Sequence, residues 1–333
     1  MKAMVLKKAM AVEENPLEYM DISTPEPGPR EILVRVYACG ICRTDLHTVE
    51  GEIRPTRMPI VPGHQVVGTV AARGPEAKRF GEGDRVGMAW LHRTCGVCPF
   101  CATGKENLCE KAQFTGFDAD GGFAEYTKIH EDFAYPIPKV FTDLEAAPLL
   151  CAGIIGYRAL RLSEIKTGQR LGLYGFGAAA HIAVQVAVHR GCEVYVFTRG
   201  ASHRTLALRL GASWAGTLND SPPVKLHSAI VFAPAGEVVP TALGHLDRGG
   251  TLALGGIYMT PIPALDYTKH LYDERTIRSV TASTRRDGIE LLEAAAEIPI
   301  RTETQSFPLK EANGALQLLK AGKINGAAVL KVL

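Results

Sequence analysis

The sequence lacks the features that mark a membrane or secreted protein. No apolar run of about eighteen residues, the length of a membrane-spanning helix, occurs in its 333 residues. The N-terminal segment MKAMVLKKAM has neither the apolar core nor the small-residue cleavage site of a secretory signal. Internal repeats and low-complexity segments are also missing. We therefore expect a cytoplasmic protein with no membrane partner.

The sequence also lacks an excess of charge. The formal net charge is +2, and the basic residues are scattered, so nothing predicts a nucleic-acid partner. Hydrophobic residues make up 46% of the chain and charged residues 22%, which suits a globular protein with a sizeable core. The length favours two domains.

Four of the eight cysteines fall in the stretch CGVCPFCATGKENLC, residues 95–109. In a reducing compartment such closely spaced thiols favour a metal over disulfides. Zinc binds four thiolates tetrahedrally, and a set that uses all four leaves no position for substrate, so we predict a structural zinc. Reduced thiols without a ligand, or an iron–sulfur cluster, are the alternatives. The predicted ligands are Cys95, Cys98, Cys101 and Cys109.

A second candidate metal set is spread along the chain, in ACGICRTDLH, VPGHQVVG and PLLCAGI. Each residue alone is weak evidence, because a buried cysteine is more often a small hydrophobe than a ligand. Together, Cys42, His64 and Cys151 form the two-cysteine, one-histidine set of a catalytic zinc with an open fourth position. Cys39 and Cys192 are predicted to be core thiols.

Beyond residue 150, apolar runs alternate with amphipathic segments, which predicts a doubly wound, parallel α/β domain. RLGLYGFGAAAHIAVQVA carries Gly175, Gly177 and Ala180 between a strand and a helix, the pattern of a dinucleotide-binding loop. Gly175 permits the tight turn, Gly177 lets the backbone approach a pyrophosphate, and Ala180 packs helix on strand. The expected strands are 170–176, 193–198, 213–216, 228–233, 250–256 and 276–281.

The first 149 residues differ, since short strands there are broken by proline and glycine, which suggests an irregular, β-rich domain. The C-terminal stretch predicts a helix over 310–320, a turn at Gly322 and a final strand.

The chain resembles the zinc-dependent, medium-chain alcohol dehydrogenases from its N-terminus to Leu333. CGICRTDLH, PGHQVVG, the four-cysteine lobe and LLCAGI follow the family's order, and the details are most similar to bacterial propanol-preferring members. The resemblance implies a GroES-like catalytic domain over 1–149 and 286–333, and a Rossmann domain with six parallel strands over 150–285. It also implies two zinc ions on the two sets named above, and a homodimer or homotetramer.

The resemblance further implies roles for residues around the catalytic zinc. Thr44 and His47 match the family's proton relay. The usual acidic residue after the ligand histidine is Gln65 here, which departs from the family pattern. The other matches are Asp45 as partner of the ligand histidine, Arg43 and Arg285 near the cofactor, and Ile53 and Trp90 in the substrate pocket.

A nicotinamide cofactor and an open-site zinc together predict the reversible oxidation of primary or secondary alcohols to aldehydes or ketones. One alternative is a polyol or sugar dehydrogenase of the same fold. Another is a zinc- or redox-sensing protein without turnover, an idea that Gln65 favours and the complete ligand and relay set opposes.

The second strand of the nucleotide domain bears on the choice of cofactor. An NAD-specific domain ends that strand with Asp or Glu, about twenty residues past the glycine loop. Here the place is taken by Thr198, followed by Arg199, with Arg204 one turn on. Because no carboxylate repels a 2′-phosphate and a guanidinium can grip it, we expect NADP(H) to be preferred over NAD(H). Arg199 and Arg204 as solvated loop charges are the alternative.

Overall fold

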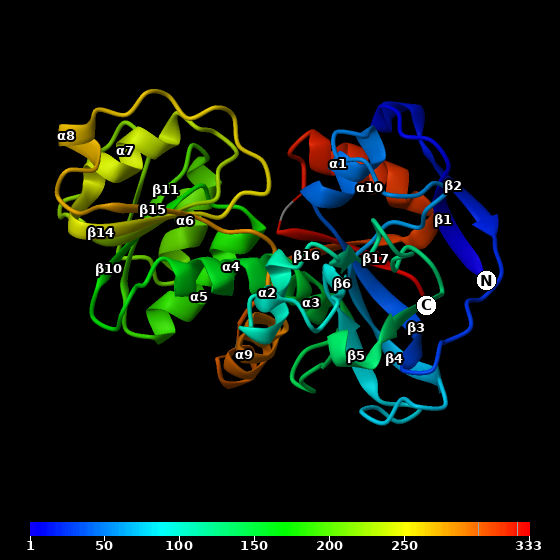
Figure 1. The fold of residues 1–333 in the computed structure, drawn as a ribbon. Helices are drawn as coiled ribbons and strands as arrows, with labels where there is room; N and C mark the ends of the chain where they lie inside the picture. The colour runs from blue at the N-terminus through cyan, green and yellow to red at the C-terminus, as the bar shows by residue number, and fades with distance from the viewer. Residues whose placement is uncertain (299, 325) are drawn as a thin grey trace. The chain divides into compact units, whose positions relative to one another are not determined.

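The computed structural model describes residues 1–298, 300–324 and 326–333, and Figure 1 shows the elements along the chain. The chain divides into two compact units. Both are discontinuous, because the chain leaves the first unit, forms most of the second and then returns. Unit 1 comprises Met1–Cys151, Ser283–Glu293 and Arg301–Leu333, and unit 2 comprises Ala152–Ala282 and Ala294–Ile300.

Unit 1 is built on a seven-stranded sheet with the order β16-β17-β3-β4-β5-β9, in which β8 also pairs with β3. Its longest strand, β3 (Glu31–Ile41), is rich in valine, isoleucine and leucine and pairs antiparallel with β4 (Gln65–Arg73). The other strands are short, as the prolines and glycines predict. They are β5 (Arg85–Met88), β8 (Tyr126–His130), β9 (Ala134–Pro136), β16 (Thr304–Pro308) and β17 (Ala327–Lys331).

Two small two-stranded sheets and several short helices complete unit 1. The small sheets are β1 (Lys2–Leu6) with β2 (Leu17–Asp21) and β6 (Leu91–Arg93) with β7 (Gln113–Phe114). The α-helices are α1 (Arg43–Glu50), α2 (Pro99–Ala102), α3 (Asp143–Ala146) and α10 (Ala312–Lys320). The 3₁₀ helices are η1 (Val12–Glu14), η2 (Glu106–Leu108), η3 (Glu131–Phe133), η4 (Ala147–Leu150) and η5 (Leu309–Glu311).

The C-terminal segment belongs to the core of unit 1. The expected helix over 310–320 is found as η5 followed by α10, and Gly322 lies in the expected turn at a φ of 67°. The final strand β17 pairs antiparallel with β3, with Leu330 opposite Cys39. The last strand of the chain therefore lies beside the strand that leads to Cys42.

Unit 2 holds a six-stranded parallel sheet with the order β12-β11-β10-β13-β14-β15. This confirms the predicted doubly wound fold with its six strands. The order reverses between β10 and β13, where open α/β sheets bind their ligands. The strands are β10 (Arg170–Tyr174), β11 (Glu193–Phe197), β12 (Trp214–Gly216), β13 (Leu226–Val231), β14 (Leu246–Leu254) and β15 (Thr276–Ser279).

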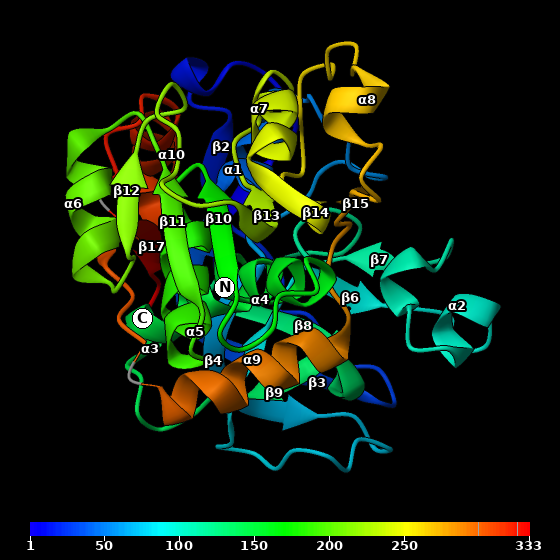
Figure 2. The ribbon, with the colours of Figure 1, turned by 90° about the vertical axis from the view of Figure 1, so that its left-hand side faces the viewer.

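Both faces of this sheet are covered, and Figure 2 shows its strands next to one another. Tyr174 and Phe197 stack at 4.2 Å between ring centroids and share a core cluster with Leu243 of α7. The alternate residues Leu173 and Val196 are fully buried as well, as strands covered on both sides require. The helices of unit 2 are α4 (Ala152–Leu162), α5 (Ala178–His189), α6 (Ala201–Arg209), α7 (Val238–His245) and α8 (Tyr267–His270), and α9 (Arg285–Glu297) contributes residues to both units.

No helix among the described residues is both long and apolar enough to cross a membrane.

Candidate active site and metal centres

The first turn of α1 fixes the positions of the Cys42 and Asp45 side chains. Cys42 is the N-cap residue in extended conformation, and its sulfur accepts a hydrogen bond from the backbone N–H of Thr44 at 3.3 Å. In return, Oδ2 of Asp45 accepts one from the backbone N–H of Cys42 at 2.8 Å. This is a capping box, with a thiol in the place of the usual hydroxyl. The helix start therefore orients the Cys42 sulfur through local backbone bonds.

His64 enters the same site from the loop before β4. The preceding Gly63 has a φ of 96°, and a Cβ there would lie 2.3 Å from Cδ1 of Phe123, so only glycine fits. Nδ1 of His64 lies 3.1 Å from Oδ1 of Asp45, and both side chains are buried. With Nδ1–H donating to the carboxylate, Nε2 is the nitrogen that can bind a metal.

The structure brings Cys42, His64 and Cys151 together. Nε2 of His64 lies 3.4 Å from the sulfur of Cys42 and 3.3 Å from that of Cys151, and the two sulfurs are 3.9 Å apart. Tetrahedral zinc bonds of about 2.0–2.3 Å require about 3.6 Å between nitrogen and sulfur and about 3.8 Å between sulfurs. The donor triangle therefore fits a zinc ion, with one position left open by the protein.

The Cys42 thiol loses its proton readily, as a metal ligand must. Its thiol has a pKa well below the ordinary value, because the Cys151 thiol donates a hydrogen bond to it and the His64 ring lies beside it. The pKa of Cys151 is raised correspondingly by that shared proton and by burial. A metal that binds here displaces the proton from Cys151.

The four cysteines of the lobe also converge. The sulfurs of Cys95 and Cys101 are 3.9 Å apart, and those of Cys98 and Cys101 are 3.5 Å apart. All four sulfurs, including that of Cys109, lie within 4.8 Å of one another. Backbone N–H groups of Val97 and Cys98 point at the sulfur of Cys95 and lower its pKa to about 6. This set also fits a tetrahedral zinc, with every position filled by thiolate.

The two predicted relay residues lie on α1. Thr44 is buried in its first turn, and His47 is three residues on, so their side chains share one face of the helix. Nδ1 of His47 is in hydrogen-bond contact with the carboxylate of Glu52, a partner that sequence reasoning missed. The helix ends at Gly51, at a φ of 78°. That glycine was the available signal, since a left-handed helix end turns the next residue back toward the last turn.

Trp90 lies beside the metal ligands. Its ring meets the His64 ring edge to face at 5.0 Å between centroids. Phe114 stacks on Trp90 at 5.0 Å, and Phe117 lies at 5.7 Å. These three half-buried rings form an aromatic wall next to the candidate zinc site, of which the sequence indicated Trp90 alone. Ile53 lies near His47, because its backbone N–H donates to the His47 carbonyl at 3.3 Å.

Two further predicted residues flank the ligands. Arg43 is exposed at the first position of α1. Gln65 is buried at the start of β4, and its Nε2 has no hydrogen-bond partner in the part of the chain that the structure describes. A buried amide nitrogen without a partner is costly, so the Gln65 side chain is a locally unfavourable neighbour of His64.

The glycine loop of unit 2 has the predicted form. Gly175 follows β10 at a φ of 91°, and a Cβ there would lie 2.9 Å from the backbone nitrogen of Ala233. Gly177 is the N-cap of α5, and no atom lies within 4 Å of where its Cβ would be. Ala180 is fully buried in the first turn of α5. The helix N-terminus is therefore open to a phosphate group.

The predicted selectivity residues follow β11. Thr198 is buried, and its backbone N–H bonds to Gly216. Nη1 of Arg204 donates hydrogen bonds to the carbonyls of Thr198 and Arg199 and so stabilises the loop after β11. Arg199 is exposed, and its side chain has no partner among the described residues. Arg199 is thus the arginine of this loop whose guanidinium is available to a ligand.

Arg285 lies in unit 1, at the start of α9. Its Nε donates to the buried carboxylate of Glu106 at 2.9 Å, and its guanidinium lies 4.7 Å from the centroid of the Phe133 ring. Glu106 belongs to η2, directly before Cys109. Arg285 therefore anchors the four-cysteine lobe, and its predicted cofactor contact stays a prediction.

Comparison with known proteins identifies the family. A model described as an alcohol dehydrogenase GroES-like domain matches residues 28–139, and a zinc-binding dehydrogenase model matches residues 178–297. A probable alcohol dehydrogenase, AdhA, of Mycobacterium tuberculosis is 51% identical over 340 residues, which cover 100% of this chain and 97% of the relative. The chain belongs to the zinc-dependent medium-chain alcohol dehydrogenase family.

Other members agree with this assignment. An alcohol dehydrogenase of Geobacillus stearothermophilus is 35% identical over 98% of this chain and 99% of its own length. The crystal structure of CAD from Helicobacter pylori, complexed with NADP(H), superposes with a TM-score of 0.87 at 26% identity over 99% of both chains. This alcohol dehydrogenase is therefore an oxidoreductase that acts on small-molecule alcohols and uses zinc and a nicotinamide cofactor.

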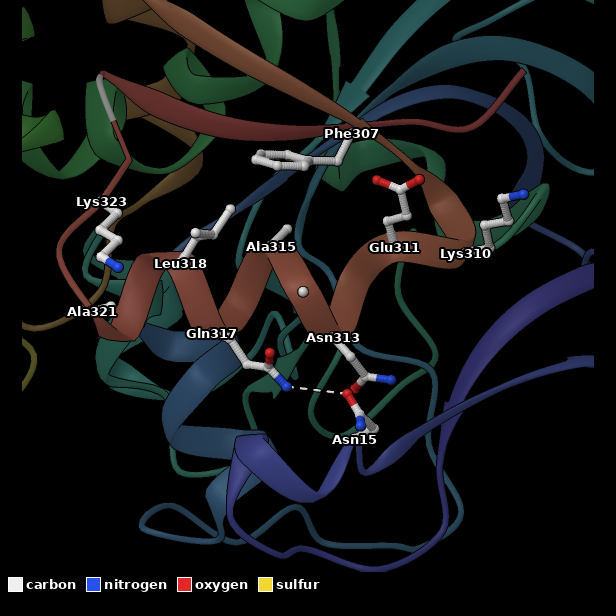
Figure 3. Close-up of a pocket in the computed structure, with 11 residues that line it drawn as sticks. Asn15, Phe307, Lys310, Glu311, Asn313, Ala315, Gln317, Leu318, Ala321 and Lys323 are labelled. Carbon is white, nitrogen blue, oxygen red and sulfur yellow. Dashed lines mark hydrogen bonds between the residues drawn. The ribbon is translucent and has the colours of Figure 1, made fainter.

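A groove of about 610 Å³ on the alcohol dehydrogenase lies along α10. Figure 3 shows Phe307, Ala315 and Leu318 on its apolar side, and Gln317 bonding to Asn15. Its lining contains no cysteine or histidine. The groove is therefore no candidate for the alcohol site.

Proposed function

We propose that this enzyme oxidises apolar primary alcohols reversibly to aldehydes at a zinc ion held by Cys42, His64 and Cys151. The observation that carries the proposal is the triangle of donor atoms, with sides of 3.3, 3.4 and 3.9 Å. Three protein ligands leave one tetrahedral position for the alcohol oxygen. Secondary alcohols are the second substrate class, with ketones as products.

In this proposal, two residues of α1 accept and transfer the proton of the alcohol hydroxyl. When bound, zinc supplies a Lewis acid that acidifies the alcohol hydroxyl, and the nicotinamide cofactor accepts the hydride. Thr44 accepts a hydrogen bond from the alcohol, and His47 takes up the released proton at a ring nitrogen. Their adjacent positions on the helix face support this division of roles. His47 is partly exposed, so it can pass the proton on to water.

The aromatic wall supports the choice of apolar substrates. Trp90, Phe114 and Phe117 offer ring faces and edges beside the ligand His64. Ile53 stays a predicted apolar residue of the same pocket. A hydrocarbon chain or ring gains free energy by leaving water for such a surface. A polyol would have to leave its hydroxyl groups without partners there, which disfavours it.

A second zinc, bound by the lobe residues Cys95, Cys98, Cys101 and Cys109, has a structural role in this proposal. The converging sulfurs support it, because four thiolates fill a tetrahedral shell. The ion pair between Arg285 and Glu106 ties the same lobe to α9. We infer that metal binding and this ion pair together fix the lobe.

We also propose that NADP(H) is preferred over NAD(H). The glycine loop at Gly175, Gly177 and Ala180 receives the pyrophosphate. The cofactor contact of Arg43 stays a prediction. Thr198 supplies no carboxylate to repel a 2′-phosphate, and the available guanidinium of Arg199 can bind one. The NADP(H) complex of the Helicobacter pylori CAD lends support.

The remaining proposals concern the domain boundaries, the assembly and the location of the enzyme. We propose a catalytic domain over 1–149 and 286–333 and a nucleotide domain over 150–285. We also propose that the enzyme is a cytoplasmic homodimer or homotetramer. Sedimentation velocity at micromolar concentration tests the assembly, and a single monomer peak contradicts it.

A substrate panel tests the proposed reaction. Formation of reduced cofactor is followed by absorbance with short, long and aromatic primary alcohols, secondary alcohols and polyols, with and without a zinc chelator. We expect kcat/KM to rise with apolar surface, polyols to be poor substrates, and the chelator to abolish turnover. Phe117→Ala should reduce the preference for aromatic alcohols about tenfold, whereas Tyr19→Ala, at an exposed aromatic position, should not. A preference for polyols, or turnover that survives removal of zinc, contradicts the proposal.

A further inference from the structure

The end of α1 brings a carboxylate onto the predicted relay histidine. Gly51 ends the helix in the left-handed region, and its backbone N–H bonds to the carbonyls of His47 and Thr48. The backbone N–H of Glu52 then donates to the His47 carbonyl at 3.0 Å. These bonds turn the chain back along the helix, so the Glu52 side chain reaches the His47 ring.

Glycine is required for this reversal. Any other residue at position 51 would have to adopt a φ of 78°, and its Cβ would lie 2.9 Å from the Cβ of Ala9. The contact between Glu52 and His47 is therefore tied to the way in which Gly51 ends the helix.

The contact defines the state of the ring. Nδ1 of His47 is in hydrogen-bond contact with Oε2 of Glu52, and the His47 side chain is 19% exposed against 60% for Glu52. In a neutral imidazole, one nitrogen donates and the other accepts. Because Nδ1–H donates to the carboxylate, Nε2 is the proton acceptor. Once Nε2 is protonated, the carboxylate faces a cation, which strengthens their hydrogen bond.

Other charged groups packed around α1 have different partners. Glu50 accepts from Nζ of Lys320 at 2.7 Å and from the backbone N–H of Val12 at 3.1 Å. Lys320, from α10, also pairs with Glu13 of η1 at 3.0 Å. Figure 3 shows α10 beside the segment that carries Asn15. Glu52, two residues past the end of α1, contacts the His47 ring, whereas Glu50 and Glu13 both pair with Lys320.

We propose that Glu52 is a positioning residue for His47, which selects the Nδ1–H tautomer and stabilises the imidazolium formed during alcohol oxidation. The inference rests on the proposed relay role of His47. In this step, one proton from the alcohol arrives at Nε2 of His47, and the Nδ1–H bond stays intact. One proton then leaves the imidazolium ring for water. No oxidant beyond the nicotinamide cofactor is needed.

The test is a double-mutant cycle on the zinc-loaded enzyme. Wild type, Glu52→Gln, His47→Gln and the double variant are compared by the rate of the first turnover across a pH series, by KM for the alcohol and by zinc content. We expect Glu52→Gln to slow the first turnover about tenfold below neutral pH, less than the 10²- to 10⁴-fold of a direct acid–base group. KM and zinc content should not change, and Glu52→Asp should recover part of the rate.

Controls separate the inference from the proposed relay. Glu50→Gln, which removes a carboxylate from the same helix, should leave the first-turnover rate unchanged. In the His47→Gln background, Glu52→Gln should cause no further loss. If His47→Gln slows the reaction and Glu52→Gln does not, or if Glu52→Gln costs as much without His47, the positioning role is wrong and the relay stands. If His47→Gln has no effect at any pH, the relay itself is wrong.

Discussion

Nδ1 of His64 lies 3.1 Å from Oδ1 of Asp45, while the other oxygen of the same carboxylate accepts a hydrogen bond from the backbone N–H of Cys42. One buried side chain thus links two candidate metal ligands that are 22 residues apart in the sequence. It holds the histidine ring in the tautomer that presents Nε2 to the metal. Burial raises the pKa of Asp45, and its hydrogen bonds with His64 and Cys42 oppose that rise.

We predict that Asp45→Asn weakens zinc binding at this site. An amide can keep one of the two hydrogen bonds, but it carries no charge to polarise the imidazole. Such partners of ligand histidines are typically worth about 10- to 100-fold in metal affinity or activity. Competition with a chelator measures the affinity, and Asp21→Asn, at an exposed aspartate, serves as the control. Equal zinc retention by both variants would contradict the linking role of Asp45.

A second prediction concerns acid stability and His92. Burial lowers the pKa of His92 from 6.5 to about 4, so the folded protein holds the ring neutral. Between these two values the unfolded chain binds the proton more readily, and stability therefore falls as the pH drops from 6.5 to about 4. The shift corresponds to about 3 kcal/mol of unfolding free energy lost across that window.

Denaturant unfolding of wild type and His92→Gln measures this contribution. The glutamine does not titrate and can keep a hydrogen bond to Thr115, the partner of Nδ1 at 3.4 Å. We expect the midpoint of wild type to fall more steeply between pH 6.5 and pH 4 than that of the variant. Parallel pH dependences would show that His92 is not kept neutral by the fold.

A third prediction concerns the selection of the cofactor. Arg199→Ala should lower the ratio of kcat/KM for NADPH to that for NADH about 10- to 100-fold, because a hydrogen bond to a charged group contributes about 1.5–3 kcal/mol. Arg248→Ala is the matched control, since Arg248 is 85% exposed and lies near the start of β14, away from the carboxyl ends of the strands. A wild type that prefers NADH, or an unchanged ratio in Arg199→Ala, rules out Arg199 as the selector.

Residues with distinctive chemistry could be predicted from the sequence. Four closely spaced cysteines, a glycine loop between strand and helix, and the set of Cys42, His64 and Cys151 each carry their function in residue type and spacing. All six strands of the nucleotide unit were expected, although β14 begins at Leu246 and not near residue 250. Strand centres are marked by apolar runs, whereas strand ends depend on hydrogen-bond partners that a sequence does not display.

Contacts made by ordinary residues could not be predicted. Phe114 and Phe117 join Trp90 only because two separate segments meet in the fold. The ion pair of Glu106 with Arg285 spans 179 residues. Such pairs depend on packing, since any phenylalanine or glutamate could equally have faced solvent. Glu52 is an intermediate case, because the glycine before it signals a helix end although not the histidine that the carboxylate reaches.

The two metal sites should have separable roles. Cys101→Ser should lower the unfolding midpoint, because a structural site contributes folding free energy. Cys151→Ser should leave that midpoint nearly unchanged and abolish turnover, because it removes a ligand from the site with an open position. Thermal unfolding and alcohol oxidation are measured on the same preparations.

The most direct test of the account is zinc content per chain, measured together with alcohol oxidation, in zinc-loaded wild type and Cys151→Ser. We predict two zinc ions and turnover in wild type, and one zinc ion with no turnover in the variant. One zinc ion in fully loaded wild type, or a variant that still oxidises alcohols, would contradict the claim that Cys42, His64 and Cys151 hold the catalytic metal.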